Sequence, residues 1–296
     1  MPLDPTEQAR LRLEAFADLD LLIEARGGFA THAELTSFTL EGRPFPLIDP
    51  NRGIRNPAEF DATLSVVSSL NGPYDDHVGD DGLLRYAFRS GDPNGGDNRK
   101  LRVAMQQRVP IILFQKLLPN VYVPIVPSYV VGEDLSAGFV FIATNDAAVR
   151  AFDSPQDVLD RRYLARLIQQ RVHQPMFRAK VMLAYDRTCA ICRLKHPEML
   201  DAAHIIADRE AHGVPHVTNG LALCKIHHAA YDNNVLGIDP DYRVHIDAEI
   251  LREVDGPMLK HGIQEMDGVA LRLPKRMTDH PNRDALAERF KIFRRY

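Results

Sequence analysis

Residues 189–232 read CAICRLKHPEMLDAAHIIADREAHGVPHVTNGLALCKIHHAAYD and contain two pairs of soft metal ligands. Cys189 and Cys192 form a C-x-x-C pair, and Cys224 and His227 form a C-x-x-H pair after 31 intervening residues. Two such pairs, each on a tight turn, are typical of a closed tetrahedral site for a structural Zn²⁺. A redox C-x-x-C pair is the alternative, but that motif is expected beside a βαβ pattern and does not need the second pair. The chain has only three cysteines, so no disulfide framework competes for them.

The residues between the two pairs predict a strand, a turn-rich segment and a helix. Residues 200–206 (LDAAHII) form a short apolar segment with the character of a strand, and residues 207–215 are rich in turn formers. Residues 218–232 are expected to form a loop that enters a helix. With its spacing of His, Asn and His, this stretch resembles the HNH endonuclease domain, which has the ββα-metal fold.

The resemblance implies a role for each of three residues. His204 matches the general base that activates water, Asn219 the amide that holds the loop and orients that base, and His228 the helix histidine that binds a catalytic divalent cation. These residue types suit phosphodiester hydrolysis, which needs a nucleophilic water and a Lewis acid. A neutral imidazole is available near pH 7, and the Asn219 side chain is expected to fix its tautomer. The cation implied is Mg²⁺ or Mn²⁺.

The chain departs from the commonest family pattern at one position. The residue before the base is usually a metal-binding Asp or His, and here it is Ala203. Asp201, two residues earlier on the strand, and Asp232, four residues after His228 on the helix, are the candidate replacement ligands. The alternatives are that Asp201 merely ends a strand and that Asp232 caps a turn.

The nuclease motif fills about fifty of the 296 residues, and 45% apolar content is enough for one or two sizeable cores. No apolar run approaches the roughly 18–20 residues of a membrane span, and the first residues lack a basic, apolar signal sequence. The sequence therefore predicts a soluble, cytoplasmic protein without a membrane partner.

Basic residues are concentrated just before the motif. The segment 161–195 has a single acid, Asp186, and nine basic side chains: Arg161, Arg162, Arg166, Arg171, Arg178, Lys180, Arg187, Arg193 and Lys195. On a helical connector such a stripe suits DNA phosphates. A solvated helix face is the alternative.

The first half of the chain predicts one helix followed by a small β-barrel. Residues 5–26 are expected to form an amphipathic helix that ends at Gly27-Gly28, with an apolar face made by Leu11, Leu13, Phe16, Leu19, Leu22 and Ile23. Short apolar runs then predict strands at residues 63–70, 83–88, 109–114, 121–131 and 138–143.

Within this half, the order of GPYDDH (72–77), Tyr86 and the Asn98-Arg99-x-Leu start of a helix resembles the SRA (YDG) domains of the PUA-like superfamily. Those domains bind DNA that carries a modified cytosine and flip that base into a pocket. The likeness covers about residues 50–145.

The resemblance implies that Tyr74 and Tyr86 line the pocket of the flipped base, while Asp76 and His77 approach its Watson–Crick edge and Asn98 and Arg99 contribute DNA contacts. Aromatic stacking and hydrogen bonds would offset the few kcal/mol that flipping costs. His77 replaces the last acid of the family tract, so the modification that is read stays open. Ordinary barrel packing is the alternative for both tyrosines.

These observations predict an α+β protein with three parts: a PUA/SRA-like β-barrel reader (residues 1–150), a basic helical connector (151–185) and a zinc-stabilised ββα-metal HNH domain with a C-terminal extension (186–296). In the extension we expect a hairpin before Leu273 and a helix over residues 282–294. The predicted function is a modification-dependent restriction endonuclease acting on double-stranded DNA. With one active site per chain, a homodimer on DNA is expected for a double-strand break. The alternatives are an HNH endonuclease without modification dependence and a non-catalytic, zinc-stabilised DNA reader.

Overall fold

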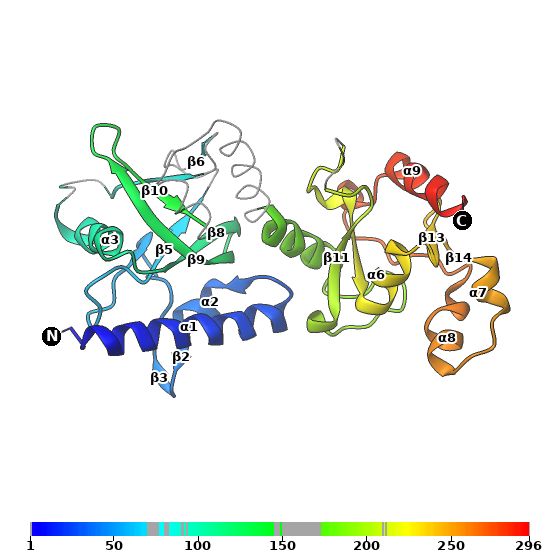
Figure 1. Cartoon of the computed structure of the whole chain (residues 1–296), viewed down its shortest axis with the longest axis horizontal. Coiled ribbons are helices and arrows are strands. Elements are labelled where there is room, and N and C mark those ends of the chain that lie inside the picture. Colours follow the sequence, from blue (N-terminus) through cyan, green and yellow to red (C-terminus); the bar gives the residue numbers. More distant parts are fainter. Residues whose placement is uncertain are drawn as a thin grey trace. The chain divides into compact units, whose positions relative to one another are not determined.

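The computed structural model describes residues 2–69, 77–79, 83–89, 92, 94–144, 149, 173–208, 210 and 212–295. The chain divides into two compact units, which are described separately. Unit 1 comprises Met1–Ile23 and Phe29–Pro175, and unit 2 comprises Glu24–Gly28 and Met176–Tyr296. The architecture is α+β, with the largest sheet in unit 1 (Figure 1). Unit 2 contains a Cys/His cluster. No helix in the described part of the chain is long and apolar enough to cross a membrane.

The long first helix, α1 (Pro5–Arg26), ends where the sequence predicts, because Gly27 and Gly28 adopt positive φ angles of 83° and 104°. Phe16 and Leu19 are buried in the apolar cluster beneath the sheet. Leu13 is 61% exposed, so its assignment to the buried face was wrong, since it lies off the stripe that Leu11, Ala15, Phe16 and Leu19 form.

Unit 1 contains an eight-stranded sheet in the order β4-β5-β8-β9-β10-β7-β6, with β1 also paired to β9. Among the described strands of this sheet, only β5 and β8 pair in parallel. The expected strands are confirmed, and the sheet curls like a half-barrel; among the described strands, β4 and β6 at its two ends are not paired with each other. The strands are β1 (Ala30–Thr31), β4 (Ile54–Arg55), β5 (Ser65–Ser68), β6 (His77–Val78), β7 (Leu84–Ala87), β8 (Ile111–Leu118), β9 (Val121–Asp134) and β10 (Phe139–Ala143).

The two faces of this sheet bury different clusters because side chains alternate along each strand. On β8, Ile112 and Phe114 join the cluster with α1, whereas Ile111 and Leu113 join a second cluster that includes Leu101 of α3. The remaining elements of unit 1 are short or peripheral: α2 (His32–Thr36), β2 (Thr39–Leu40), β3 (Arg43–Pro44) and α3 (Gly96–Gln107).

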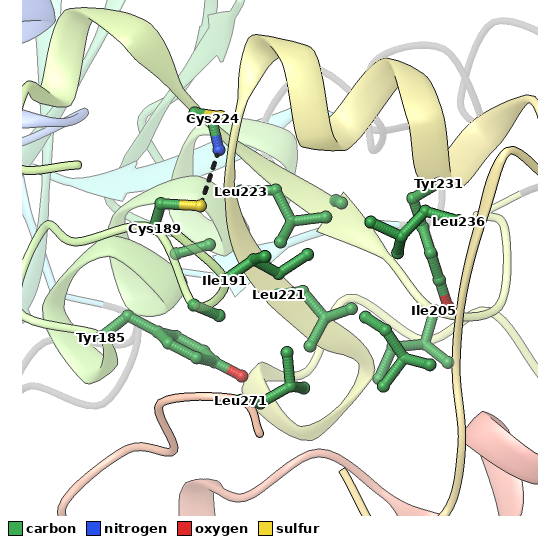
Figure 2. Packing of buried hydrophobic residues seen from close by; sticks show 14 of the residues in the cluster. Tyr185, Cys189, Ile191, Ile205, Leu221, Leu223, Cys224, Tyr231, Leu236 and Leu271 are labelled. Carbon is green, nitrogen blue, oxygen red and sulfur yellow. Dashed lines mark hydrogen bonds between the residues drawn. The ribbon is translucent and has the colours of Figure 1, made fainter. Parts of the chain in front are cut away.

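Unit 2 is centred on a ββα unit. Strands β11 (Leu200–His204) and β12 (Gly220–Cys224) form an antiparallel pair, and α6 (Lys225–Asp232) packs against both (Figure 1). Residues 218–232 were expected to form a loop that enters a helix, but residues 220–224 form β12, which is buried along its whole length. Figure 2 shows the core around this pair, where Leu221 and Leu223 lie among Tyr185, Ile205 and Leu271.

Helical residues 176–184 belong to unit 2, and Phe177, Val181 and Met182 are buried in its core. The end of the predicted connector therefore packs into the core of this unit.

After α6 come β13 (Leu236–Ile238), β14 (Val244–Ile246), α7 (Ala248–Arg252) and α8 (Pro257–Gly262). The hairpin expected before Leu273 is replaced by α8 and a 3-10 turn at Gln264–Met266. The final helix is confirmed as α9 (Arg283–Phe293), and its Phe293 packs on Gly237 of β13, where any Cβ would clash with the ring. Three further 3-10 turns lie at Pro197–Met199, Val217–Asn219 and Met277–Asp279.

Candidate metal sites and catalytic cavity

Cys189, Cys192, Cys224 and His227 converge at one point of unit 2. Their four ligand atoms all lie within 4.8 Å of one another. The Nδ1 atom of His227 is 3.2 Å from the sulfur of Cys224 and 3.6 Å from that of Cys189. The first two cysteines come from the turn after helix 173–184, and the other two ligands come from the end of β12 and the first turn of α6. The cluster can therefore hold a metal ion.

The His227 ring is oriented for this role by a backbone group. Its Nε2 atom is 2.9 Å from the carbonyl oxygen of Gly262, which accepts the Nε2 proton and leaves Nδ1 free to bind an ion. The ring is almost completely buried. Three thiols and one imidazole are a donor set that suits Zn²⁺.

His204 is placed by the hairpin and by the helix that covers it. It pairs with Gly220 across β11 and β12, and its ring stacks on Phe177 at a centroid distance of 4.0 Å and an interplanar angle of 16°. Gly220 permits this approach, since a Cβ there would lie 2.9 Å from Cζ of Phe177 and would also clash with Val181. Packing against Phe177 and Val181 therefore explains why the residue after Asn219 is a glycine.

Burial lowers the pKa of His204 below its ordinary value of about 6.5, and the nearby charge of His228 acts in the same direction. Asp208 and Asp232 act in the opposite direction, but burial is the largest cause. The Nε2 atom of His204 is buried and has no hydrogen-bond partner in the described part of the chain. The imidazole is therefore neutral near pH 7, as a general base must be.

Asn219 holds the loop that follows the first strand. Its side-chain oxygen accepts the Ile206 amide at 2.9 Å, and its nitrogen donates to the carbonyls of Ile206 at 3.0 Å and Val214 at 3.2 Å. All these bonds go to the backbone, so the expectation that the Asn219 side chain fixes the His204 tautomer was wrong. The Asn219 amide instead fixes the backbone that follows His204, because it bonds both the N–H and the carbonyl of Ile206 across the loop.

His228 lies between the two candidate carboxylates. Its Nδ1 atom is 3.3 Å from Oδ2 of Asp201, and its Nε2 atom is 3.4 Å from Oδ2 of Asp232. Asp201 also accepts from Arg178 at 3.4 Å. The structure therefore brings Asp201, His228 and Asp232 together, as the sequence analysis expected.

A cavity of about 500 Å³ opens beside His204. Asp232 and Asn234 line it from α6 and the turn after it, while Glu288, Arg289 and Ile292 line it from α9. The remaining lining residues are Ile205, Ile206, Ala207 and Glu210. His204 and Asp232, two of the residues singled out in the sequence, therefore line the same cavity.

Sequence analysis missed the contribution of α9. Arg289 donates to the side-chain oxygen of Asn234 at 2.6 Å and to the carbonyl of Tyr231 at 2.5 Å, and its guanidinium lies over the Tyr231 ring. These bonds satisfy the C-terminal end of α6, which carries His228 and Asp232. No local pattern could have revealed this contact, because Arg289 is more than fifty residues beyond the motif.

The basic stripe is described only from Arg178 onward, and Arg161, Arg162, Arg166 and Arg171 lie outside the described residues. Arg178 is engaged by Asp201 and by the carbonyl of Pro197. Lys180, Arg193 and Lys195 are exposed, and Arg187 is half-buried.

In unit 1, Tyr74 and Asp76 lie outside the described residues, and the backbone of His77 pairs with Arg85 across β6 and β7. Tyr86 is buried in the apolar cluster with α3, and its hydroxyl donates to the carbonyl of Gly53 at 3.1 Å. This placement favours the packing alternative for Tyr86.

Asn98 and Arg99 have different surroundings at the start of α3. Asn98 is buried, accepts from the Arg89 amide at 3.1 Å and donates to the carbonyls of Arg89 and Asp92. Arg99 is exposed. Asn98 therefore holds the preceding loop, and Arg99 is the one of this pair that is accessible to DNA.

A buried polar pair that sequence analysis did not identify lies on strands β5 and β8 of unit 1. Ser68 and Gln115 are register partners on β5 and β8, and both are buried. Among the residues that the structure describes, the Ser68 hydroxyl and both amide atoms of Gln115 have no hydrogen-bond partner. By strand alternation they face the same side as Val66, Leu113 and Tyr86. A polar residue at the end of an apolar strand is too weak a signal to identify such a pair.

Comparison with known proteins finds a family model that matches the segment with the two ligand pairs. Residues 189–239 match the family model of HNH endonuclease. A solved modification-dependent TagI restriction endonuclease is 14% identical, with 81% of this chain and 85% of that chain covered at a TM-score of 0.30. The complex of the SUVH5 SRA domain with methylated CHH DNA is 21% identical, with 38% and 79% covered at a TM-score of 0.26. Both TM-scores are too low to establish a shared fold, and comparison with the curated protein sequences finds no match.

Proposed function

From the premise that residues 189–239 form an HNH endonuclease domain, we propose that the chain is a modification-dependent restriction endonuclease. It binds double-stranded DNA with a modified cytosine through residues 1–150 and hydrolyses a phosphodiester bond in unit 2. The observation that carries the nuclease function is the cavity that both His204 and Asp232 line, with the Nε2 atom of His228 3.4 Å from Oδ2 of Asp232.

His204 is the general base in this proposal. Its lowered pKa keeps the imidazole neutral, so that it can take a proton from the attacking water. The stacked Phe177 ring holds the imidazole in place and keeps water from one face. Asn219 fixes the backbone after His204 and so limits the positions that the base can adopt.

His228 and Asp232 are the residues that would hold a catalytic Mg²⁺ or Mn²⁺. Imidazole nitrogen and carboxylate oxygen both suit such ions, and these two atoms are 3.4 Å apart. When bound, the ion would polarise the phosphoryl oxygens and stabilise the departing alkoxide. Arg289 supports this arrangement by holding the end of α6.

Cys189, Cys192, Cys224 and His227 would hold a structural Zn²⁺. The four donors fill a tetrahedral ion and leave no open position, so this site stabilises the fold and takes no part in hydrolysis. It joins the turn after helix 173–184 to the start of α6, and thereby to His228, the next residue along the helix.

The reader part of the proposal assigns the captured base to the face of the unit 1 sheet that carries Tyr86. The support is the sequence resemblance over residues 50–145, with Tyr74, Asp76 and His77 in its tract and Arg99 exposed on α3. Ser68 and Gln115 add buried donors and acceptors without partners, next to strand residue Val67, whose amide shares the Gly53 carbonyl with the Tyr86 hydroxyl. Groups of this kind can pair with a base edge.

DNA contacts beside the cleavage site are proposed for the basic stripe, with Lys180, Arg193 and Lys195 as its exposed members in the described part. One chain supplies one catalytic cavity, so a double-strand break requires two chains or two successive nicks. We assign the first route, a homodimer on DNA, which sedimentation with a modified duplex can test.

One observation favours a second candidate function. The buried position of Tyr86 agrees with ordinary packing, and an HNH endonuclease whose first half does not read modification would then cut all duplexes equally. A non-catalytic reader is disfavoured because His204, Asn219 and His228 all have the surroundings that hydrolysis needs.

The deciding experiment compares matched plasmids bearing cytosine, 5-methylcytosine or 5-hydroxymethylcytosine, with Mg²⁺ or Mn²⁺ added. We expect cutting confined to a modified plasmid and abolished in His204→Ala. His261→Ala, a substitution of an exposed histidine on α8, is the matched control and should cut normally. Equal cutting of the three plasmids would leave the nuclease and remove the reader, and no cutting of any plasmid would contradict the nuclease.

A further inference from the structure

Asp201 and Asp232 approach opposite sides of the His228 ring. Asp201 contacts Nδ1 and Asp232 contacts Nε2. Because the two carboxylates face different ring nitrogens, His228 does not direct one nitrogen at both of them. In this arrangement one carboxylate can share an ion with His228, and the other must have a different role.

The cavity distinguishes the two carboxylates. Asp232 lines the same space as His204, and its charge acts on the pKa of His204, whereas Asp201 does neither. Because the scissile phosphate must reach both the base and the ion, the ion belongs on the Nε2 side, between His228 and Asp232.

Both oxygens of Asp201 already have cationic or proton-donating partners. Oδ1 accepts from Arg178 at 3.4 Å and Oδ2 faces Nδ1 of His228 at 3.3 Å. A carboxylate that accepts the Nδ1 proton fixes the tautomer in which Nε2 carries the lone pair. Arg178 in turn holds the carboxylate in place from the covering helix.

We propose that Asp201 is a positioning residue that fixes the tautomer and orientation of His228, and that it is not a ligand of the catalytic ion. This inference rests on the proposed metal-dependent nuclease function. It gives the Ala203 departure a physical account: the strand supplies no ligand at that position, and its carboxylate two residues earlier acts through His228 instead. Arg178, expected to bind phosphate, serves here as the partner of that carboxylate.

The test compares Asp201→Asn, Asp201→Ala and Asp232→Asn with the unaltered full chain, all with the Cys/His cluster loaded with Zn²⁺. Binding of Mn²⁺ is followed by electron paramagnetic resonance without DNA, and the His228 tautomer by ¹⁵N shifts of labelled histidine. Asparagine keeps an oxygen that accepts the Nδ1 proton but is a weaker ligand for a hard cation. The Mn²⁺ affinity of Asp201→Asn should therefore stay within about threefold of that of the unaltered chain, and His228 should keep its Nδ1–H tautomer.

Asp232→Asn should lose Mn²⁺ affinity by about tenfold or more. Asp201→Ala should lose Mn²⁺ affinity by about tenfold to a hundredfold, and the ¹⁵N signal of the Nδ1–H tautomer of His228 should also be lost. If Asp201→Asn loses as much affinity as Asp232→Asn, or if Asp232→Asn loses none, the inference is overturned. If Asp201→Ala does not fold, the comparison of Asp201→Asn with Asp232→Asn still tests the inference. If the unaltered chain binds no Mn²⁺, the proposed nuclease chemistry itself is contradicted. This result distinguishes failure of the proposed function from failure of the role proposed for Asp201.

Discussion

His227 and His228 are neighbours on α6, yet they belong to two sites of opposite character. His227 is buried, with Nδ1 among three thiols and Nε2 tied to a backbone carbonyl. His228 is partly exposed and lies between two carboxylates beside an open cavity. Adjacent helical positions point about 100° apart, so one turn of helix can serve a closed site for a soft cation and an open site for a hard one.

The largest expected effect comes from removing the closed site. Cys224→Ser or Cys189→Ser should cost unit 2 most of its stability, because structural Zn²⁺ contributes on the order of 10 kcal/mol in small zinc domains. Thermal unfolding with and without a chelator measures this loss, and added Mg²⁺ should not reverse it. A variant that kept both its zinc content and its melting temperature would show that the cluster is not structural.

Removing the base should leave the fold and abolish the chemistry. We expect His204→Ala to slow DNA cleavage by about 10²- to 10⁴-fold, which is the usual contribution of a positioned general base, with zinc content and melting temperature nearly unchanged. Single-turnover cleavage rates measure it. Comparable loss in His261→Ala would indicate a non-specific effect.

Gly220→Ala should disturb the open site through packing. The new methyl group would meet Val181 and Phe177, so we expect a loss of about 1–3 kcal/mol in unfolding free energy. Displacing Phe177 from His204 should also raise the pKa of the base, which the pH dependence of cleavage reports. Gly256→Ala, where a Cβ meets no atom within 4 Å, is the matched control and should change neither quantity.

Gln115→Leu should move stability and recognition in opposite directions. Replacing buried amide atoms that lack partners removes a desolvation cost of about 1–3 kcal/mol, so the free protein should be more stable, while its preference for modified duplex should fall. Chemical denaturation and duplex binding measure the two effects. An unchanged preference would remove Gln115 from the reader site.

The smallest effect concerns pH. Since burial lowers the pKa of His204, the base stays neutral to lower pH than a free histidine, and the acidic limb of cleavage should lie below about pH 6.5. The same shift makes folding less favourable as pH falls through that range, because the unfolded chain takes up the proton first. In His204→Ala this component of the pH dependence of unfolding should disappear.

Sequence reasoning was most successful where ligands are close in the chain. The C-x-x-C and C-x-x-H pairs converge as expected, and Asp232 meets His228 because positions four apart share a helical face. It failed at β12, expected to be a loop, and at Leu13, because burial of those residues depends on partners far along the chain.

The amino-acid sequence by itself determined which soft ligands converge in unit 2, because local secondary structure converts the spacing of the C-x-x-C and C-x-x-H pairs directly into geometry. The roles proposed for His204 and His228 come from the resemblance to HNH endonucleases. Only the tertiary structure decided which groups surround them. Phe177 reaches His204 across Gly220, Arg289 reaches the end of α6 from α9, and Asp201 meets Arg178. Such contacts join segments that are distant in the chain. Local sequence patterns do not predict them, because only the packing of the folded chain decides which side chain meets which partner.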